Sequence, residues 1–192
     1  MKISVITVCY NAENVIEQTI QSVLNQNYTD IEYIVVDGAS SDGTMEIIRR
    51  YAAIDSRVRY ISEQDRGIYD AMNKGIGLAT GDYLEFLNAG DLLVDSEVIE
   101  TVVQGIIQTG ADVVYGNIIY EYPDGTTNVR MYGSFCSGLF YYLLGDCINH
   151  QAIFAKRECF ETHKFNTKYQ ICADREWMMQ IKKDGKKFRA LN

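Results

Sequence analysis

The sequence has little proline, little histidine and fewer basic than acidic side chains. Its 192 residues include one proline and two histidines, and 18 lysines and arginines stand against 26 aspartates and glutamates, for a formal net charge of −8. A protein that binds nucleic acid through its phosphates needs a basic surface, so this balance argues against a nucleic-acid partner. Hydrophobic residues make up 47% and charged residues 23%, a composition that excludes a disordered chain.

Cysteine pairs and long apolar runs are also missing. The five cysteines are odd in number and contain no Cys-x-x-Cys pair, so they predict neither a disulfide framework nor a zinc site. We expect reduced thiols that pack as small core residues, as is typical of cytoplasmic proteins. The longest apolar stretch, Leu139 to Leu144, is far shorter than the ~20 residues that span a bilayer. We expect this stretch to be buried, with contact at a membrane surface as the alternative. Residues 1–13 lack the long apolar stretch and the cleavage site of a signal peptide.

The first hundred residues alternate between the hydrophobic periods of strands and helices. Apolar runs predict strands over residues 3–9, 32–37, 58–62 and 82–87. Apolar residues at helical spacing predict helices over residues 16–24 and 70–79 and after the caps Thr44 and Ser96, with Asn11 or Asn14 capping the first. This alternation is typical of βαβ units and a mainly parallel sheet, which binds its ligand beyond the carboxyl ends of its strands.

The second half of the chain is less regular. The pattern predicts strands over residues 112–120 and 151–155, a hairpin turn at Tyr122–Gly125, a helix over residues 174–183 and the beginning of a strand over residues 186–192. A soft boundary near Gly110 divides one continuous domain into two halves, residues 1–110 and 111–192.

Two carboxylates follow predicted strands. Asp37 ends the second strand beside a Gly-Ala-Ser-Ser-Asp-Gly loop, where it could accept hydrogen bonds from a base or a ribose, or simply close an Asx-turn. Asp91 follows the fourth strand on an Asn-Ala-Gly-Asp turn. A carboxylate there suits a divalent cation that bridges two phosphates, with a plain type I turn as the alternative.

Three further groups of residues could carry chemistry. Arg66 and Lys74 lie in a charged segment and could face a diphosphate, or belong to a solvated surface. Asp174 lies beside apolar residues, so we expect partial desolvation to raise its proton affinity and make it a general base, with a helix N-cap as the alternative. His150 precedes an apolar run and is either a structural histidine or a substrate contact.

In this order, these segments resemble the family 2 glycosyltransferases of the GT-A fold, and in particular the bacterial branch that builds capsule, lipopolysaccharide or exopolysaccharide. The resemblance covers nearly the whole chain and is carried by residues 3–11, 35–44, 65–75, 81–91, 150–151 and 173–174. It implies an α/β GT-A fold, in which a Rossmann-like, mainly parallel sheet is flanked by helices and a smaller mixed region lies on the acceptor side. Residues 1–110 would then bind the nucleotide sugar, and residues 111–192 would hold the acceptor and the catalytic base.

The resemblance also implies a role for each matching residue. Asp91 matches the last acid of the family's DxD-type motif and would bind Mg²⁺ or Mn²⁺. Asn88 replaces the first acid of that motif and could still offer a carbonyl oxygen to the metal. Asp174 matches the catalytic base, and His150 and Gln151 fall on the acceptor side. The nucleotide-binding residues would be Thr7, Tyr10, Asn11, Asp37, Asp65, Arg66 and Lys74.

The implied activity is that of a metal-dependent, inverting hexosyltransferase. It would move a sugar from a nucleotide-sugar donor, UDP-linked by default with GDP and dTDP as alternatives, to a hydroxyl of a glycan or lipid-linked sugar acceptor. We expect a cytoplasmic protein, with peripheral contact at the inner face of the membrane as a further option, and additional residues beyond Asn192, since family members usually continue there. Two alternatives stay open. A sugar nucleotidyltransferase needs a Gly- and Arg-rich loop that residues 7–13 lack, and a non-catalytic nucleotide-sugar-binding partner subunit would have no need of the retained acids.

Overall fold

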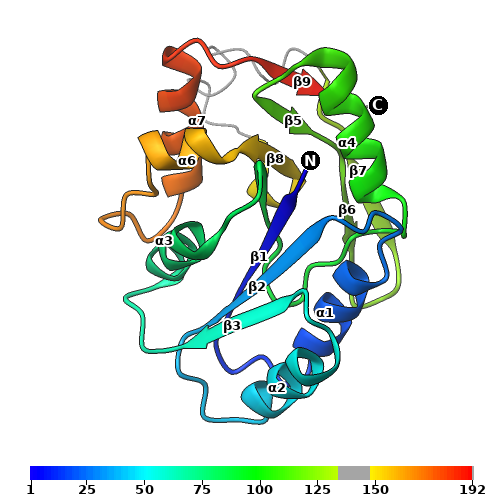
Figure 1. The fold of residues 1–192 in the computed structure, drawn as a ribbon, viewed down its shortest axis with the longest axis vertical. Coiled ribbons are helices and arrows are strands. Elements are labelled where there is room, and N and C mark those ends of the chain that lie inside the picture. The colour runs from blue at the N-terminus through cyan, green and yellow to red at the C-terminus, as the bar shows by residue number, and fades with distance from the viewer. Residues whose placement is uncertain (134–147, 192) are drawn as a thin grey trace.

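A seven-stranded sheet covered by helices on both faces organises the chain (Figure 1). The computed structural model describes residues 1–133 and 148–191. Within these residues the strand order is β3-β2-β1-β4-β8-β5-β9. The strands of this sheet are β1 (Ile3–Cys9), β2 (Ile31–Asp37), β3 (Val58–Ser62), β4 (Tyr83–Phe86), β5 (Val113–Tyr115), β8 (Ile153–Lys156) and β9 (Phe188–Ala190).

The helices form two layers with an apolar core beneath each. The first, second and fourth helices cover one face of the sheet, and the third, sixth and seventh cover the other (Figure 1). Their bounds are α1 (Ile16–Leu24), α2 (Thr44–Ile54), α3 (Ile68–Leu78), α4 (Val98–Thr109), α6 (Arg157–Thr162) and α7 (Ala173–Lys183).

The two central strands explain why the sheet is mainly parallel, as the sequence predicts. Every residue of β1 and β2 is buried, because alternate side chains enter the two cores. Strand β1 pairs in parallel with β2 and with β4, and β2 pairs in parallel with β3. Strand β8 is the exception, because it runs antiparallel to both β4 and β5. It therefore joins residues after Gly110 to the sheet formed by the first half of the chain.

The predicted strand over residues 112–120 is wrong in one respect, since it divides into two elements. Strand β5 joins the main sheet, whereas β6 (Ile118–Glu121) pairs with β7 (Thr127–Arg130) in a separate hairpin. Between them the Asn117 side chain accepts a hydrogen bond from the Tyr132 amide at 2.8 Å, which directs the chain into the hairpin. The hairpin turn predicted at Tyr122–Gly125 is confirmed by the bond from the Tyr122 amide to the Thr126 carbonyl at 2.9 Å.

Other boundaries also differ from the prediction. The predicted strand over residues 151–155 begins only at Ile153, because His150–Ala152 form the 3₁₀ turn η2. Helix α6 was not predicted from its short apolar pattern. Figure 1 shows α6 beside α7 on the same side of the sheet.

The predicted helix caps are wrong, because these helices begin at or after other residues and make no side-chain hydrogen bond at their N-cap positions. Thr44 is the first residue of α2 rather than its cap, and its amide donates to the Asp42 carboxylate at 3.0 Å. Helix α1 follows Val15 and helix α4 follows Glu97, with no side-chain hydrogen bond at either N-cap position. Neither Asn11, Asn14 nor Ser96 therefore occupies the predicted N-cap position.

A glycine allows α3 to lie close to the sheet. A Cβ atom at Gly75 would lie 2.5 Å from the Cγ2 atom of Ile6 on β1. This distance is well inside van der Waals contact, so only glycine fits without a shift of the helix. The helix that the sequence predicts over residues 70–79 forms over Ile68–Leu78, despite the low helix propensity of glycine.

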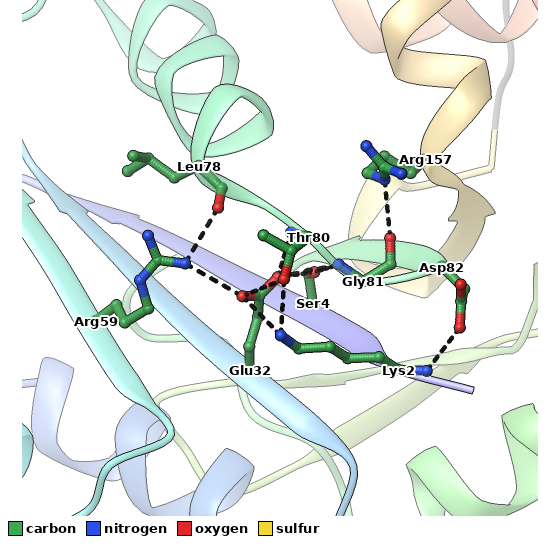
Figure 2. A network of polar contacts seen from close by, with 9 residues as sticks. All are labelled: Lys2, Ser4, Glu32, Arg59, Leu78, Thr80, Gly81, Asp82 and Arg157. Carbon is green, nitrogen blue, oxygen red and sulfur yellow. Dashed lines mark hydrogen bonds and ion pairs between the residues drawn. The ribbon is translucent and has the colours of Figure 1, made fainter.

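A buried carboxylate ties the start of β4 to the start of the sheet (Figure 2). Glu32 of β2 accepts hydrogen bonds from the Ser4 hydroxyl at 2.6 Å and from the Gly81 amide at 3.0 Å. Lys2 and Arg59 complete the network with ion pairs to Glu32 of 3.2 Å and 3.3 Å. The network lies at the amino ends of the parallel strands, opposite the edge where a ligand is expected.

Two remaining expectations concern cysteines and membranes. Cys9 and Cys159 are buried as predicted, but Cys172 is exposed, because it lies in the turn that precedes α7. Leu139 to Leu144, like Cys136 and Cys147, lie outside the described residues. In the two ranges that the structure covers, no helix combines the length and the apolar character needed to cross a bilayer.

Candidate active site

Two loops lie side by side at the carboxyl ends of β1 and β2. The last residues of these strands, Cys9 and Asp37, are register partners. After them, the Asn11 amide donates to the Ser40 hydroxyl at 2.8 Å, and the Asn11 side chain accepts from the Ser41 amide at 2.9 Å. Asn11 adopts a positive φ of 49°, a conformation that asparagine tolerates better than most residues. These bonds join the two loops into one wall.

Two of the predicted nucleotide-binding residues are buried in the strands that lead to these loops. Asp37 has no exposed surface, and its carboxylate accepts from the Ser40 amide at 3.0 Å and the Ser62 hydroxyl at 2.6 Å. Thr7 is equally buried, and its hydroxyl donates to the Leu87 carbonyl at 2.7 Å. Asp37 therefore supports the loop at Ser40, whereas Thr7 holds the residue that precedes Asn88. A ligand would meet the loops first.

An open pocket of about 370 Å³ adjoins the wall. Its size lies in the range of small-molecule sites. Tyr10 is 65% exposed, so its ring is free to stack against a planar ligand group. A Cβ atom at Gly38 would lie 2.6 Å from Asp65 Oδ2, so glycine is what allows Asp65 to approach the wall. The pocket is lined by Tyr10, Gly38, Ala39, Gln64 and Asp65.

The two predicted phosphate-binding cations lie beside the pocket in different settings. Arg66 is 81% exposed and pairs with Asp70 at 3.1 Å, and this guanidinium lowers the pKa of the Asp70 carboxyl. Such an exposed pair is weak, so an incoming phosphate can replace Asp70 at low cost. Lys74 donates to the Gln64 carbonyl at 2.8 Å and pairs with Glu63 at 3.0 Å. Lys74 therefore also supports one wall of the pocket.

The structure brings the other five predicted site residues into one cluster. His150 Nδ1 lies 3.3 Å from Asp174 Oδ2, and His150 Nε2 lies 2.9 Å from Asn88 Nδ2. The next residue, Gln151, donates from Nε2 to the Asp91 carboxylate at 3.2 Å. These residues come from the end of β4, from η2 and from the first turn of α7, which are far apart in sequence.

The sequence analysis missed Tyr69. Its hydroxyl donates to the second oxygen of Asp174 at 3.1 Å, so both oxygens of this carboxylate are held. Burial and the charge of Asp174 raise the pKa of Tyr69, which keeps the hydroxyl protonated and donating. The only available signal was its place in the charged segment between Asp65 and Gly75.

The expectation that desolvation raises the proton affinity of Asp174 is wrong. Burial does act in that direction, but hydrogen bonds from His150, from the Arg175 amide and from Tyr69 outweigh it and lower the pKa of Asp174 below its ordinary value. Asp174 is thus an ionised acceptor at neutral pH. It also lies within α7, one residue after its first residue, Ala173, rather than at its N-cap.

Asp91, the predicted metal ligand, lies near other buried polar side chains. Burial raises the pKa of Asp91, and Glu85, which is completely buried on β4, has a pKa raised well above its ordinary value by burial and by the charge of Asp91. Within the described residues, the Asn88 Oδ1 and Gln151 Oε1 atoms and both carboxyl oxygens of Glu85 are buried without hydrogen-bond partners. The same ranges contain no group of three or more His, Cys, Asp or Glu residues that could hold a metal alone. A cation here would need ligands from a substrate, as Mg²⁺ sites with one or two carboxylates commonly do.

Comparison with protein families and curated proteins gives a consistent result. The model of glycosyl transferase family 2 matches residues 4–176. A PGL/p-HBAD biosynthesis glycosyltransferase of Mycobacterium bovis is 34% identical over 182 residues, which cover 93% of this chain and 68% of that protein. Glycosyltransferase AglE of Haloferax volcanii is 38% identical over 136 residues, covering 69% of this chain and 44% of the relative.

Solved structures share the fold. Residues 1–349 of TarS from S. aureus superpose with a TM-score of 0.80 at 18% identity, covering all of this chain and 58% of that one. The mannosyltransferase PcManGT of Pyrobaculum calidifontis, in complex with GDP-Man and Mn²⁺, gives a TM-score of 0.76 at 22% identity over 98% of this chain and 54% of that one. The chain thus spans little more than half the length of these structures. The predicted GT-A fold is confirmed, and by the match over residues 4–176 the chain belongs to glycosyl transferase family 2.

Proposed function

We propose that this chain transfers a sugar, with inversion, from a nucleotide-sugar donor to an acceptor hydroxyl in the synthesis of bacterial surface polysaccharide. The observation that carries this proposal is the Asp174 carboxylate. It is held by His150 and Tyr69 and linked through His150 to Asn88, on the same turn as Asp91. A proton acceptor and a cation-binding turn in one network are the parts that a displacement at a sugar–diphosphate bond requires.

The donor would lie along the carboxyl edge of the sheet. Its base and ribose would fit the pocket lined by Tyr10 and Asp65, whose loops are held by Asn11 and Asp37, with Thr7 buried on β1. Solved complexes of TarS with UDP and with UDP-GlcNAc support a UDP-linked donor, and the GDP-Man complex of PcManGT keeps GDP as the alternative. Arg66 and Lys74 would face the diphosphate.

The residues present fit a divalent cation. Asp91 would supply one carboxylate, and the unpartnered amide oxygens of Asn88 and Gln151 are hard oxygen atoms of the kind that Mg²⁺ or Mn²⁺ prefers. When bound, the cation would neutralise charge that develops on the leaving diphosphate. The Mn²⁺ in the PcManGT complex supports this assignment.

The chain's own residues would perform the proton transfer. Asp174 accepts the proton of the acceptor hydroxyl as the oxygen forms its bond to the anomeric carbon. The bond from that carbon to the diphosphate oxygen breaks on the opposite face, and the nucleoside diphosphate leaves. One displacement inverts the configuration. The acceptor, a glycan or lipid-linked sugar, would approach from the side of residues 111–192, and residues 1–110 would bind the donor. A cytoplasmic location with peripheral membrane contact remains a prediction.

A matched pair of variants at the two ends of α7 tests the proposal. Asp174→Asn should keep donor binding and lose nucleotide release from a panel of nucleotide sugars with Mn²⁺ by at least about 100-fold. Asp184→Asn, at the exposed end of the same helix, should behave as wild type. Near-normal turnover of Asp174→Asn would remove Asp174 as the base. Donor binding without any release by the wild type would favour the non-catalytic partner subunit.

A further inference from the structure

The short turn η2 holds groups from two distant elements. His150 contacts Asp174 on α7 through Nδ1 and Asn88 after β4 through Nε2, at 3.3 Å and 2.9 Å. The side chains of His150 and Asp174 are only 18% and 13% exposed, so these contacts are sheltered from water. Gln151 repeats the arrangement beside it, with its bond to Asp91 at 3.2 Å.

The donors and acceptors of this network allow one assignment with a neutral histidine. A neutral imidazole carries one N–H and one lone pair. The ionised carboxylate of Asp174 can only accept, so His150 Nδ1 must carry the proton. His150 Nε2 then accepts, and Asn88 Nδ2 is the group that donates to it. An aspartate at position 88 has no such donor when ionised.

The same assignment fixes the orientation of the Asn88 amide. Because its nitrogen faces His150, its Oδ1 is turned away, and that atom is buried with no partner among the described residues. Gln151 Oε1 is also buried without a partner, because the amide nitrogen of Gln151 is the atom that donates to Asp91. The pattern gives a physical reason for asparagine where the family motif has an acid.

We propose that His150 is a positioning residue that, through its Nδ1–H tautomer, locks the Asp174 carboxylate and the Asn88 amide into one unit. This inference rests on the proposed function, and it replaces acceptor contact as the role of His150. One imidazole then fixes the turn that carries Asn88 and Asp91 relative to the Asp174 carboxylate. A change in that relative position would slow the chemical step rather than weaken donor binding.

Two amide variants separate the contact of His150 with Asp174 from its contact with Asn88. The His150→Asn amide nitrogen takes the place of Nδ1 and keeps the bond to Asp174, whereas the His150→Gln amide reaches toward Asn88 and loses the Asp174 bond. We expect His150→Gln to lower kcat by about 10- to 100-fold and change the donor KM by less than about threefold. His150→Asn should retain more of kcat than His150→Gln. The control is His163→Asn, at the second histidine, which pairs with Asp184, and this variant should match wild type.

A spectroscopic measurement tests the tautomer without relying on activity. The chain has two histidines, so nitrogen-15 NMR of the full chain gives two imidazoles, and His163→Asn identifies the signals of His150. We expect His150 to show a protonated Nδ1 and an unprotonated Nε2, the reverse of the form that free histidine favours. A protonated Nε2 with a bare Nδ1, or a wild-type kcat in a folded His150→Gln, overturns the proposal. If wild type transfers no sugar while the Nδ1–H form is present, the proposed function fails, but the bridge that His150 makes between Asp174 and Asn88 stands.

Discussion

Replacing Glu32 by glutamine should remove a large, pH-dependent part of the stability. The Glu32 carboxylate is 6% exposed and lies among donors from three other segments of the chain (Figure 2). Burial alone would raise its pKa, but bonds from Ser4 and from the amide and hydroxyl of Thr80 dominate and lower it to about 2 from an ordinary value of 4.5. Glutamine has about the same shape but would turn an NH₂ group toward these donors.

The magnitude follows from this pKa difference. One pKa unit is worth ~1.4 kcal/mol, so lowering the pKa from 4.5 to about 2 stabilises the folded state by about 3 kcal/mol. A depressed folded-state pKa means that this contribution is complete above the unfolded-state pKa and is lost as the pH falls toward the folded-state value. Linkage gives a loss of about 2 kcal/mol between pH 6 and pH 3.

Urea unfolding of wild type and Glu32→Gln at several pH values measures this effect. We expect Glu32→Gln to be less stable by about 3 kcal/mol at pH 6, since it leaves buried donors without their carboxylate. The gap between the two proteins should shrink by about 2 kcal/mol at pH 3. Glu46→Gln, at an exposed position on α2, is the control and should show no such gap. A gap for Glu32→Gln that is constant from pH 6 to pH 3 would refute an ionised Glu32 in the folded protein.

Three further substitutions test the site and its support. Gly75→Ala should lower the free energy of unfolding by about 1–3 kcal/mol, measured with urea, because the new methyl meets Ile6 at 2.5 Å; a stabilised variant would contradict the packing. Gly38→Ala should weaken UDP binding about fivefold in calorimetry, because Asp65 must move, and unchanged affinity would remove Asp65 from the pocket. Asp91→Ala should abolish the gain in nucleoside diphosphate affinity that Mn²⁺ gives the wild type. Equal wild-type affinity with and without Mn²⁺ would count against the cation role.

The central parallel strands were predictable because their signal is local. Residues 3–9 and 32–37 are short runs in which apolar residues predominate, and the structure has strands at Ile3–Cys9 and Ile31–Asp37. The predicted strand at 112–120 failed because its division depends on the bond between Asn117 and Tyr132, 15 residues away. No hydrophobic period encodes such a contact.

The candidate site was predictable as a set of residues but not as a network. The residue types at the strand ends and the family resemblance pointed to Asp91, Asp174 and His150. The direction of the Asp174 pKa could not be inferred, since it depends on His150, 24 residues away, and on Tyr69, 105 residues away. The hydrogen bonding of the buried Asp37 likewise involves Ser62 from a neighbouring strand.

The most direct test of the central claim uses water as the acceptor, because slow hydrolysis needs no knowledge of the natural one. Wild-type protein with Mn²⁺ and an α-linked UDP-sugar is followed by proton NMR, and the first free sugar is observed before its anomers equilibrate. We predict that the β-anomer forms first with wild type and that Asp174→Asn forms no sugar above background. An α-anomer formed first, or equal rates for the two proteins, would contradict inverting transfer with Asp174 as the base.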